Sequence, residues 1–114
     1  MKIALLTAPN NEVIAVEDQF GKTEGQFIRL PDGSVQYIHP SDLSPWPAGS
    51  SLAQFEAAAE AWNTYAHCVV GANEEDQLRC VSALRDALLK LGVGELGAHS
   101  YWAVLLEQAE QGLL

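Results

Sequence analysis

Short runs of β-branched and aliphatic residues alternate with turn residues in the first half of the chain. These runs predict strands over residues 2–7, 12–17, 26–30 and 35–39. The first two runs are apolar at consecutive positions, which favours central strands covered at least partly on both faces. Residues 8–11, with one Pro and two Asn, predict the turn between them. Residues 18–25 predict a longer polar connection to the third strand.

The clearest turn in the sequence is Pro31-Asp32-Gly33-Ser34, between the third and fourth strands. Pro suits the first central position of a type I turn, Asp the second, and Gly the left-handed residue that follows. The next segment, residues 40–49, carries three of the five prolines. Because proline interrupts regular structure, we expect this segment to cross irregularly from the sheet to the helices.

Apolar residues recur at helical spacing in the second half and predict helices over residues 51–69, 74–91 and 99–111. Ser51 and Gln54 form a capping-box pattern, Asn73 can cap the second helix, and Gly92 can end it. The whole chain, residues 1–114, is therefore expected to be one α+β domain, with an antiparallel sheet packed against three C-terminal helices. The buried helix positions are expected to be Leu52, Phe55, Ala59, Trp62, Ala66 and Val69; Leu78, Val81, Leu84, Leu88 and Leu91; and Trp102, Leu105, Leu106 and Ala109.

Composition places the chain among globular proteins, with 48% hydrophobic and 18% charged residues. Its apolar runs are far shorter than the roughly 20 residues of a membrane span, and its N-terminus lacks the pattern of a signal peptide. We therefore expect a cytoplasmic protein that does not enter membranes. Cys68 and Cys80 occur without a CxxC motif, so buried, reduced thiols are the leading interpretation, with a disulfide or a reactive role as alternatives.

The sequence contains fragments of catalytic and ligand-binding motifs, but their spacing and predicted surroundings do not match what those motifs require. Residues 92–97 spell GxGxxG, but a predicted helix precedes them where a dinucleotide site needs a strand. His39, His67 and His99 lack metal-ligand spacing, and Ser50 lacks the GxSxG elbow of a serine nucleophile. We expect neither catalytic residues nor a metal or other cofactor.

Net charge is the strongest compositional signal, because 15 acidic residues against 6 basic ones give a formal charge of −9. Such a surface repels nucleic acid and acidic membranes and favours basic partners, although it also serves solubility alone. Trp62 and Trp102 are expected in the core, whereas the loop residue Trp46 is either an interface anchor or packed on the core. The candidate partner-binding residues are Glu17, Asp18, Asp42, Trp46, Glu56 and Glu60. For the carboxylates the alternative is an ordinary solvated surface.

Two segments carry a resemblance to a known family. Ser50-Ser51-Leu52-Ala53-Gln54-Phe55 follows a sheet hairpin, and Ser100-Tyr101-Trp102-Ala103-Val104-Leu105-Leu106-Glu107-Gln108 precedes a Gly-Leu-Leu ending. Together with Gly33-Ser34-Val35 they resemble the SUKH superfamily of bacterial immunity proteins, most closely its fourth subgroup, over residues 26–114. The resemblance implies an α+β fold and neutralisation of a toxin delivered between competing bacteria, often a nuclease or deaminase.

These observations lead to one hypothesis and one alternative. A small-molecule enzyme is a third interpretation, which would need a deep pocket with convergent polar groups and a carboxylate or histidine of perturbed pKa. The hypothesis is an immunity-type protein that occludes a cognate toxin, with a basic toxin domain as its partner. The alternative is an adaptor or scaffold module of the same fold that binds a protein other than a toxin. Neither role requires catalysis, and the sequence does not define an oligomeric state.

Overall fold

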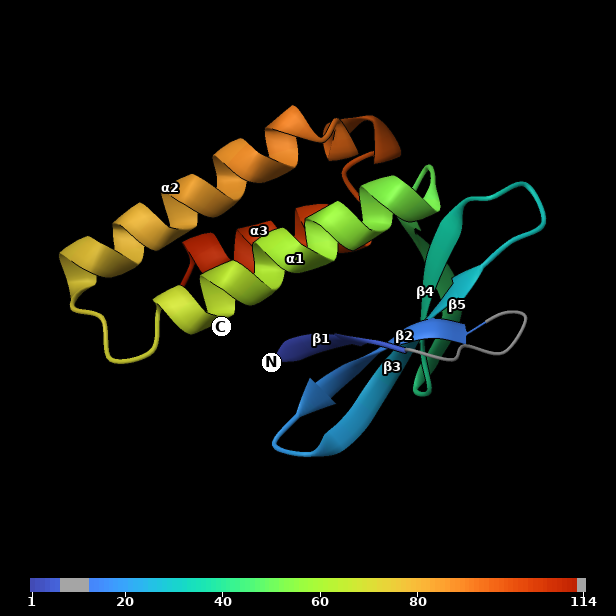
Figure 1. The fold of residues 1–114 in the computed structure, drawn as a ribbon, viewed down its shortest axis with the longest axis horizontal. Helices are drawn as coiled ribbons and strands as arrows, with labels where there is room; N and C mark the ends of the chain where they lie inside the picture. Colours follow the sequence, from blue (N-terminus) through green and yellow to red (C-terminus); the bar gives the residue numbers. More distant parts are fainter. Residues whose placement is uncertain (7–12, 113–114) are drawn as a thin grey trace.

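A computed structural model describes residues 1–6 and 13–112 of the chain. Five antiparallel strands in sequential order form one sheet: β1 Lys2–Leu5, β2 Val13–Gln19, β3 Lys22–Arg29, β4 Val35–His39 and β5 Asp42–Gly49. The helices follow: α1 Leu52–Cys68, α2 Glu74–Lys90, a 3-10 turn η1 Val93–Leu96, and α3 Tyr101–Glu110 (Figure 1). The expected α+β class is confirmed. The turn expected at residues 8–11 lies outside the described residues.

The tight turns explain how these strands pair. In the turn after Leu30, Gly33 has φ 92° and Ser34 donates its backbone N–H to the Asp32 carboxylate at 2.9 Å, as the turn chemistry predicts. The expected long connection over residues 18–25 is wrong. Residues 18–19 and 22–25 belong to β2 and β3, so only Phe20 and Gly21 form the loop.

The fifth strand was not expected, because its prolines suggested irregular structure. β5 pairs with β4, with Tyr37 opposite Trp46 and His39 opposite Asp42. Because β5 is the last strand of the sheet, it forms a ladder on one side only. An edge strand accepts prolines whose nitrogens face away from its neighbour, which explains why Pro45 and Pro47 are tolerated here.

The helix boundaries follow the capping residues. The side chain of Ser51 accepts from the N–H of Gln54, and the side chain of Asn73 accepts from the N–H of Asp76. Ser100 caps α3 in the same way. Gly92, with φ 76°, follows α2 in the left-handed conformation that ends helices. The predicted helices are thus present, with ends that differ from the prediction by at most two residues.

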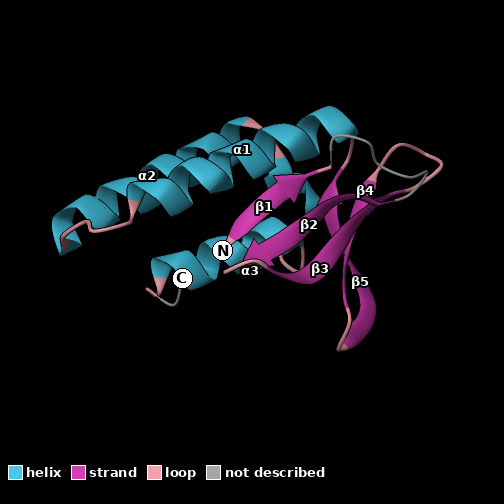
Figure 2. Cartoon of the chain, turned by 60° about the horizontal axis from the view of Figure 1, so that its bottom comes forward, coloured by secondary structure: helices cyan, strands magenta, loops and turns pink. Residues whose placement is uncertain are grey.

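The core lies between the helices and one face of the twisted sheet (Figure 2). Trp62 and Trp102 are buried in it, as expected. Leu78 was expected in the buried stripe of α2 but is 66% exposed, because the buried residues of α2 begin at Cys80 and continue with Val81, Leu84 and Leu88. The largest fully buried side chains are Trp62, Trp102, Tyr101, Phe27, Phe55, Ile3, Val35 and Ser100. Among the described residues, no helix is long and apolar enough to cross a membrane.

β1 lies at the edge of the sheet rather than at its centre, so the expectation of a central first strand is wrong. α1 covers this edge with one polar side chain. The Asn63 carboxamide accepts from the N–H of Ile3 at 2.8 Å and donates to the carbonyl oxygen of Ile3 at 2.8 Å. The two hydrogen bonds replace those of a neighbouring strand and protect the edge from pairing with other chains.

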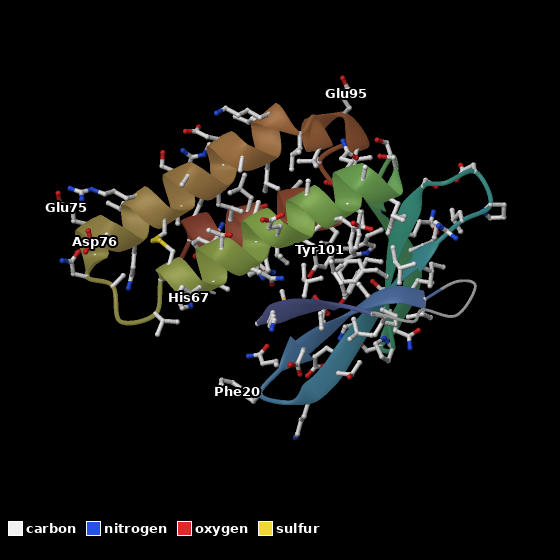
Figure 3. All side chains as sticks on the ribbon, viewed as in Figure 1. Phe20, His67, Glu75, Asp76, Glu95 and Tyr101 are labelled. Carbon is white, nitrogen blue, oxygen red and sulfur yellow. A yellow bond between two sulfur atoms is a disulfide. The ribbon has the colours of Figure 1, made fainter. Side chains whose placement is uncertain are left out.

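Cys68 and Cys80 form a disulfide, so the leading interpretation of two buried, reduced thiols is wrong. The short turn between α1 and α2 folds the helices side by side and brings the two Cα atoms to 6.0 Å. Cys80 is buried but Cys68 is exposed at the end of α1. The bond joins the two helices at the end where Figure 3 labels His67 and Asp76.

Candidate functional site

Glu17 of β2 has the most unusual environment of the predicted site residues. Only 7% of its surface is exposed, so Glu17 is not part of an ordinary solvated surface, and its role in partner binding stays a prediction. Its Oε1 accepts from the Tyr37 hydroxyl at 2.5 Å and from the Gly25 N–H at 3.1 Å. Its Oε2 accepts from the Tyr101 hydroxyl at 2.6 Å. These donors offset the cost of removing a carboxylate from water.

An irregularity in the β2–β3 ladder produces this arrangement. Between the pairs Val16–Gln26 and Asp18–Thr23, β2 advances two residues and β3 three, so β3 bulges opposite Glu17. The bulge contains Gly25, where a Cβ atom would overlap the ring of Tyr37. Glycine at this position therefore allows the phenol to reach the carboxylate.

The two phenols that hold Glu17 resist ionisation. Burial raises the pKa of Tyr101 well above its ordinary value, and the neighbouring Glu17 carboxylate raises it further. The pKa of Tyr37 is raised by burial and by its hydrogen bond to Glu17. Both hydroxyls therefore keep their protons at neutral pH and direct them to Glu17.

A pocket of about 330 Å³ opens above this hydrogen-bonded group, and we refer to it as the Glu17 pocket. It combines residues from the sheet and from α3, and three predicted site residues, Glu17, Asp42 and Trp46, meet in it. Trp46 is partly buried and its ring centroid lies 5.9 Å from that of Tyr37. The lining consists of Glu17, Tyr37, His39, Ser41, Asp42, Ser44, Trp46, Tyr101, Val104 and Gln108.

His39 and Ser41 form a local contact at the rim of the pocket. Nδ1 of His39 accepts the backbone N–H of Ser41 at 3.1 Å and lies 2.6 Å from its hydroxyl oxygen. Nε2 lies 3.9 Å from a carboxylate oxygen of Glu24. Because Nδ1 accepts the backbone N–H of Ser41, this contact is part of the turn between β4 and β5. Within residues 1–6 and 13–112, no group of three or more His, Cys, Asp or Glu side chains could hold a metal ion.

Glu56 and Glu60 lie on a different surface, which we name the α1 groove. Both side chains are exposed on α1, next to Leu5 of β1, which is 48% exposed. This open groove of about 800 Å³ shares none of its lining residues with the Glu17 pocket. Its lining consists of Leu5, Ala53, Glu56, Ala57, Glu60, Asn63, Thr64 and His67. Asp18 lines neither site.

The most exposed aromatic residue was missed by sequence reasoning. Phe20 is 97% exposed at the tip of the β2–β3 hairpin, and its side chain points away from the molecule (Figure 3). Its φ of 53° is the only positive value of a non-glycine residue in the part of the chain that the structure describes. Gly21 follows with φ 82°. The sequence does contain a signal for this two-residue loop, because Gly21 lies between two strand-like segments. The preferred pairs for such a loop are Asn-Gly, Asp-Gly and Gly-Gly, so Phe at its first position does not indicate a hairpin.

Comparisons of the chain with protein-family models, with curated proteins and with solved structures each found no match.

Proposed function

We propose that this protein is an immunity-type inhibitor that binds a basic, nucleic-acid-acting bacterial toxin and occludes it, without chemistry of its own. The resemblance of residues 50–55 and 100–108 to the SUKH superfamily supports the class. The single observation that carries the binding role is Phe20. The cytoplasm is its proposed place of action.

Phe20 combines two unfavourable features, a left-handed backbone and an exposed aromatic ring. A left-handed backbone costs a residue with a Cβ atom roughly 1–2 kcal/mol. A side chain that is 97% exposed recovers none of this cost by burial. Strained conformations of this kind concentrate at functional sites. Insertion of the Phe20 ring into a pocket of a partner would remove its apolar surface from water and so offset this cost. Aromatic residues also contribute a large share of the binding energy at protein interfaces.

The charge of the protein indicates which partners it favours. The formal charge is −9, and Asp18 precedes the hairpin tip by two residues. Toxins that act on nucleic acids have basic clefts to hold phosphates, so an acidic inhibitor gains attraction and complementarity there. Glu56 and Glu60 form a second acidic edge in the α1 groove, beside the exposed Leu5.

The substitution Phe20→Asn tests the role of the hairpin tip. Asn-Gly is the preferred pair for a two-residue loop with two positive φ angles, so the free protein should gain about 1 kcal/mol of stability. Binding of the partner should weaken at least tenfold, because an interface anchor is lost. The control is Leu89→Gln on α2, which removes another exposed apolar side chain and should leave affinity unchanged. Equal affinity of Phe20→Asn and the wild type would exclude Phe20 as the anchor.

Salt and charge reversal test the electrostatic part of the proposal. Association should slow with increasing ionic strength and in a Glu56→Lys/Glu60→Lys variant, whereas dissociation should change less. Indifference of the association rate to salt would reject electrostatic steering.

The identity of the partner separates the toxin role from the adaptor alternative. A pull-down from the native host followed by mass spectrometry should recover a basic nuclease-like domain that binds one to one. Recovery of a housekeeping protein instead would favour the adaptor or scaffold role.

A further inference from the structure

We infer that the Glu17 pocket binds the guanidinium group of an arginine side chain presented by the protein partner. The inference rests on the proposed function in one respect, namely that a protein carries the cation. It assigns the pocket a ligand chemistry that follows from its hydrogen-bonding groups, its aromatic wall and its charge.

The buried polar groups of the pocket, which are Glu17 and the phenols of Tyr37 and Tyr101, offer hydrogen-bond acceptors to a ligand. The hydroxyl protons of Tyr37 and Tyr101 both point to Glu17, so each phenolic oxygen presents only lone pairs to the pocket. Glu17 accepts three hydrogen bonds, two at Oε1 and one at Oε2. A carboxylate has about four acceptor positions, which leaves one at Oε2 for a ligand. The complementary group is therefore one that donates several hydrogen bonds.

The wall of the pocket suits a flat cation. Tyr37 and Trp46 lie with their ring centroids 5.9 Å apart, and Trp46 remains partly exposed above the pocket. Aromatic faces attract cations, and Trp does so most strongly. Asp42 is exposed at the rim, where its carboxylate accepts the backbone N–H of Ser44 at 3.0 Å and keeps further acceptor capacity.

Guanidinium fits these features better than ammonium or an anion. It is planar, stacks on aromatic rings and directs five N–H donors along fixed directions, whereas ammonium is a compact, strongly hydrated charge. A phosphate or carboxylate ligand would be repelled by the carboxylates of Glu17 and Asp42, which both line the pocket. A pocket of about 330 Å³ is at the small end of ligand sites, which suits one side chain.

The test is an NMR titration of the intact, oxidised protein with N-acetyl-arginine amide. Its neutral isostere, N-acetyl-citrulline amide, is the matched ligand control. We expect saturable shifts of the Trp46 indole N–H with the arginine compound and none with citrulline. The substitution Trp46→Leu should weaken arginine binding about fivefold, which the backbone amide signals of β4 and β5 would report. Asp42→Asn should weaken it about threefold. Glu60→Gln, in the α1 groove, should leave it unchanged.

Each outcome separates this inference from the proposed function. Equal shifts with citrulline, shifts confined to the α1 groove, or unchanged binding by Trp46→Leu would overturn the inference. If a basic toxin is bound and Trp46→Leu binds it as tightly as the wild type, the inference fails and the immunity role stands. If the arginine compound binds selectively but the chain recovers no basic protein from the host, the proposed function fails and the chemistry of the pocket stands.

Discussion

The hydroxyl of Tyr101 donates to Oε2 of Glu17 at 2.6 Å across 84 positions of the sequence. This bond joins α3 to β2, the last helix to the second strand. Tyr37 and Gly25 hold the other oxygen from β4 and β3. One carboxylate thereby links three adjacent strands and a helix, and the Glu17 pocket exists only where these elements meet.

Removing the Tyr101 hydroxyl should destabilise the protein. In Tyr101→Phe the ring keeps its packing, but Glu17 loses a donor in a buried setting. Hydrogen bonds to charged groups are worth about 1.5–3 kcal/mol, so the free energy of unfolding should fall by about 2 kcal/mol. Urea denaturation followed by tryptophan fluorescence measures this change.

A double-mutant cycle assigns the loss to the Glu17–Tyr101 pair. With Glu17→Gln as the second substitution, the two effects should fall short of additivity by about 1–2 kcal/mol, since both remove the same interaction. Additive effects would mean that Tyr101 stabilises the fold through its packing alone.

Substitution of Gly25 should be equally damaging. The Cβ atom of Gly25→Ala would overlap the Tyr37 ring, so the ring must move away from Glu17. Overpacking of this kind costs roughly 1–3 kcal/mol, and loss of the Tyr37 hydrogen bond adds to it. Gly94→Ala is the matched control, because no atom lies within 4 Å of the added methyl group. Similar stability of the two variants in chemical denaturation would exclude a steric requirement at Gly25.

Local chemistry explains why so much of the fold was predictable. The caps at Ser51 and Asn73 and the turn at Gly33 depend on residues within a few positions of one another. The burial of Trp62 and Trp102 follows from helical periodicity. Because such signals involve residues that are close in sequence, they can be recognised without knowledge of the tertiary structure.

The features that were missed depend on distant partners. Pro45 and Pro47 interrupt a central strand but are acceptable in β5, because β5 lies at the edge of the sheet. Glu17 is buried because a bulge in β3 and a residue of α3 supply its donors. Glu56 and Glu60 are exposed as expected, since their position on α1 follows from helical periodicity alone.

Alkaline pH should unfold the protein earlier than an ordinary domain. Burial raises the pKa of Tyr37, Tyr65 and Tyr101 in the folded state above that of the unfolded chain, which is about 10. The stability that these tyrosines contribute is fully present below pH 10, where both states are protonated. It falls as pH rises from about 10 towards the folded pKa values, by about 1.4 kcal/mol per pH unit for each tyrosine.

Absorbance of tyrosinate and circular dichroism, recorded over the same alkaline titration, measure this linkage. Ionisation and unfolding should coincide, because the folded state retains the protons. Tyr37→Phe and Tyr101→Phe should each reduce the slope of stability against pH. Complete tyrosine ionisation in a protein that remains folded would contradict the prediction.

Reduction of the disulfide between Cys68 and Cys80 should lower stability without abolishing the fold. The two cysteines are 12 positions apart in the sequence, so the bond closes a short loop. In the chain-entropy model, restricting the unfolded chain in this way adds about 3 kcal/mol to the free energy of unfolding. Cys68 is exposed, so Cys68→Ser should lose about this amount and no more. Cys80 is buried, so Cys80→Ser should lose more, because it also places a hydroxyl in an apolar setting.

Thermal denaturation of the oxidised and reduced wild type and of the two serine variants separates two effects. One is the loss of the disulfide, and the other is the burial of a hydroxyl at position 80. Reduced wild type and Cys68→Ser should unfold at similar temperatures, with Cys80→Ser below both. A reduced protein that is still folded at the growth temperature of its host fits action in the cytoplasm, where disulfides are rare. A reduced protein that is unfolded there would instead require an oxidising compartment, and the proposed cytoplasmic role would be wrong.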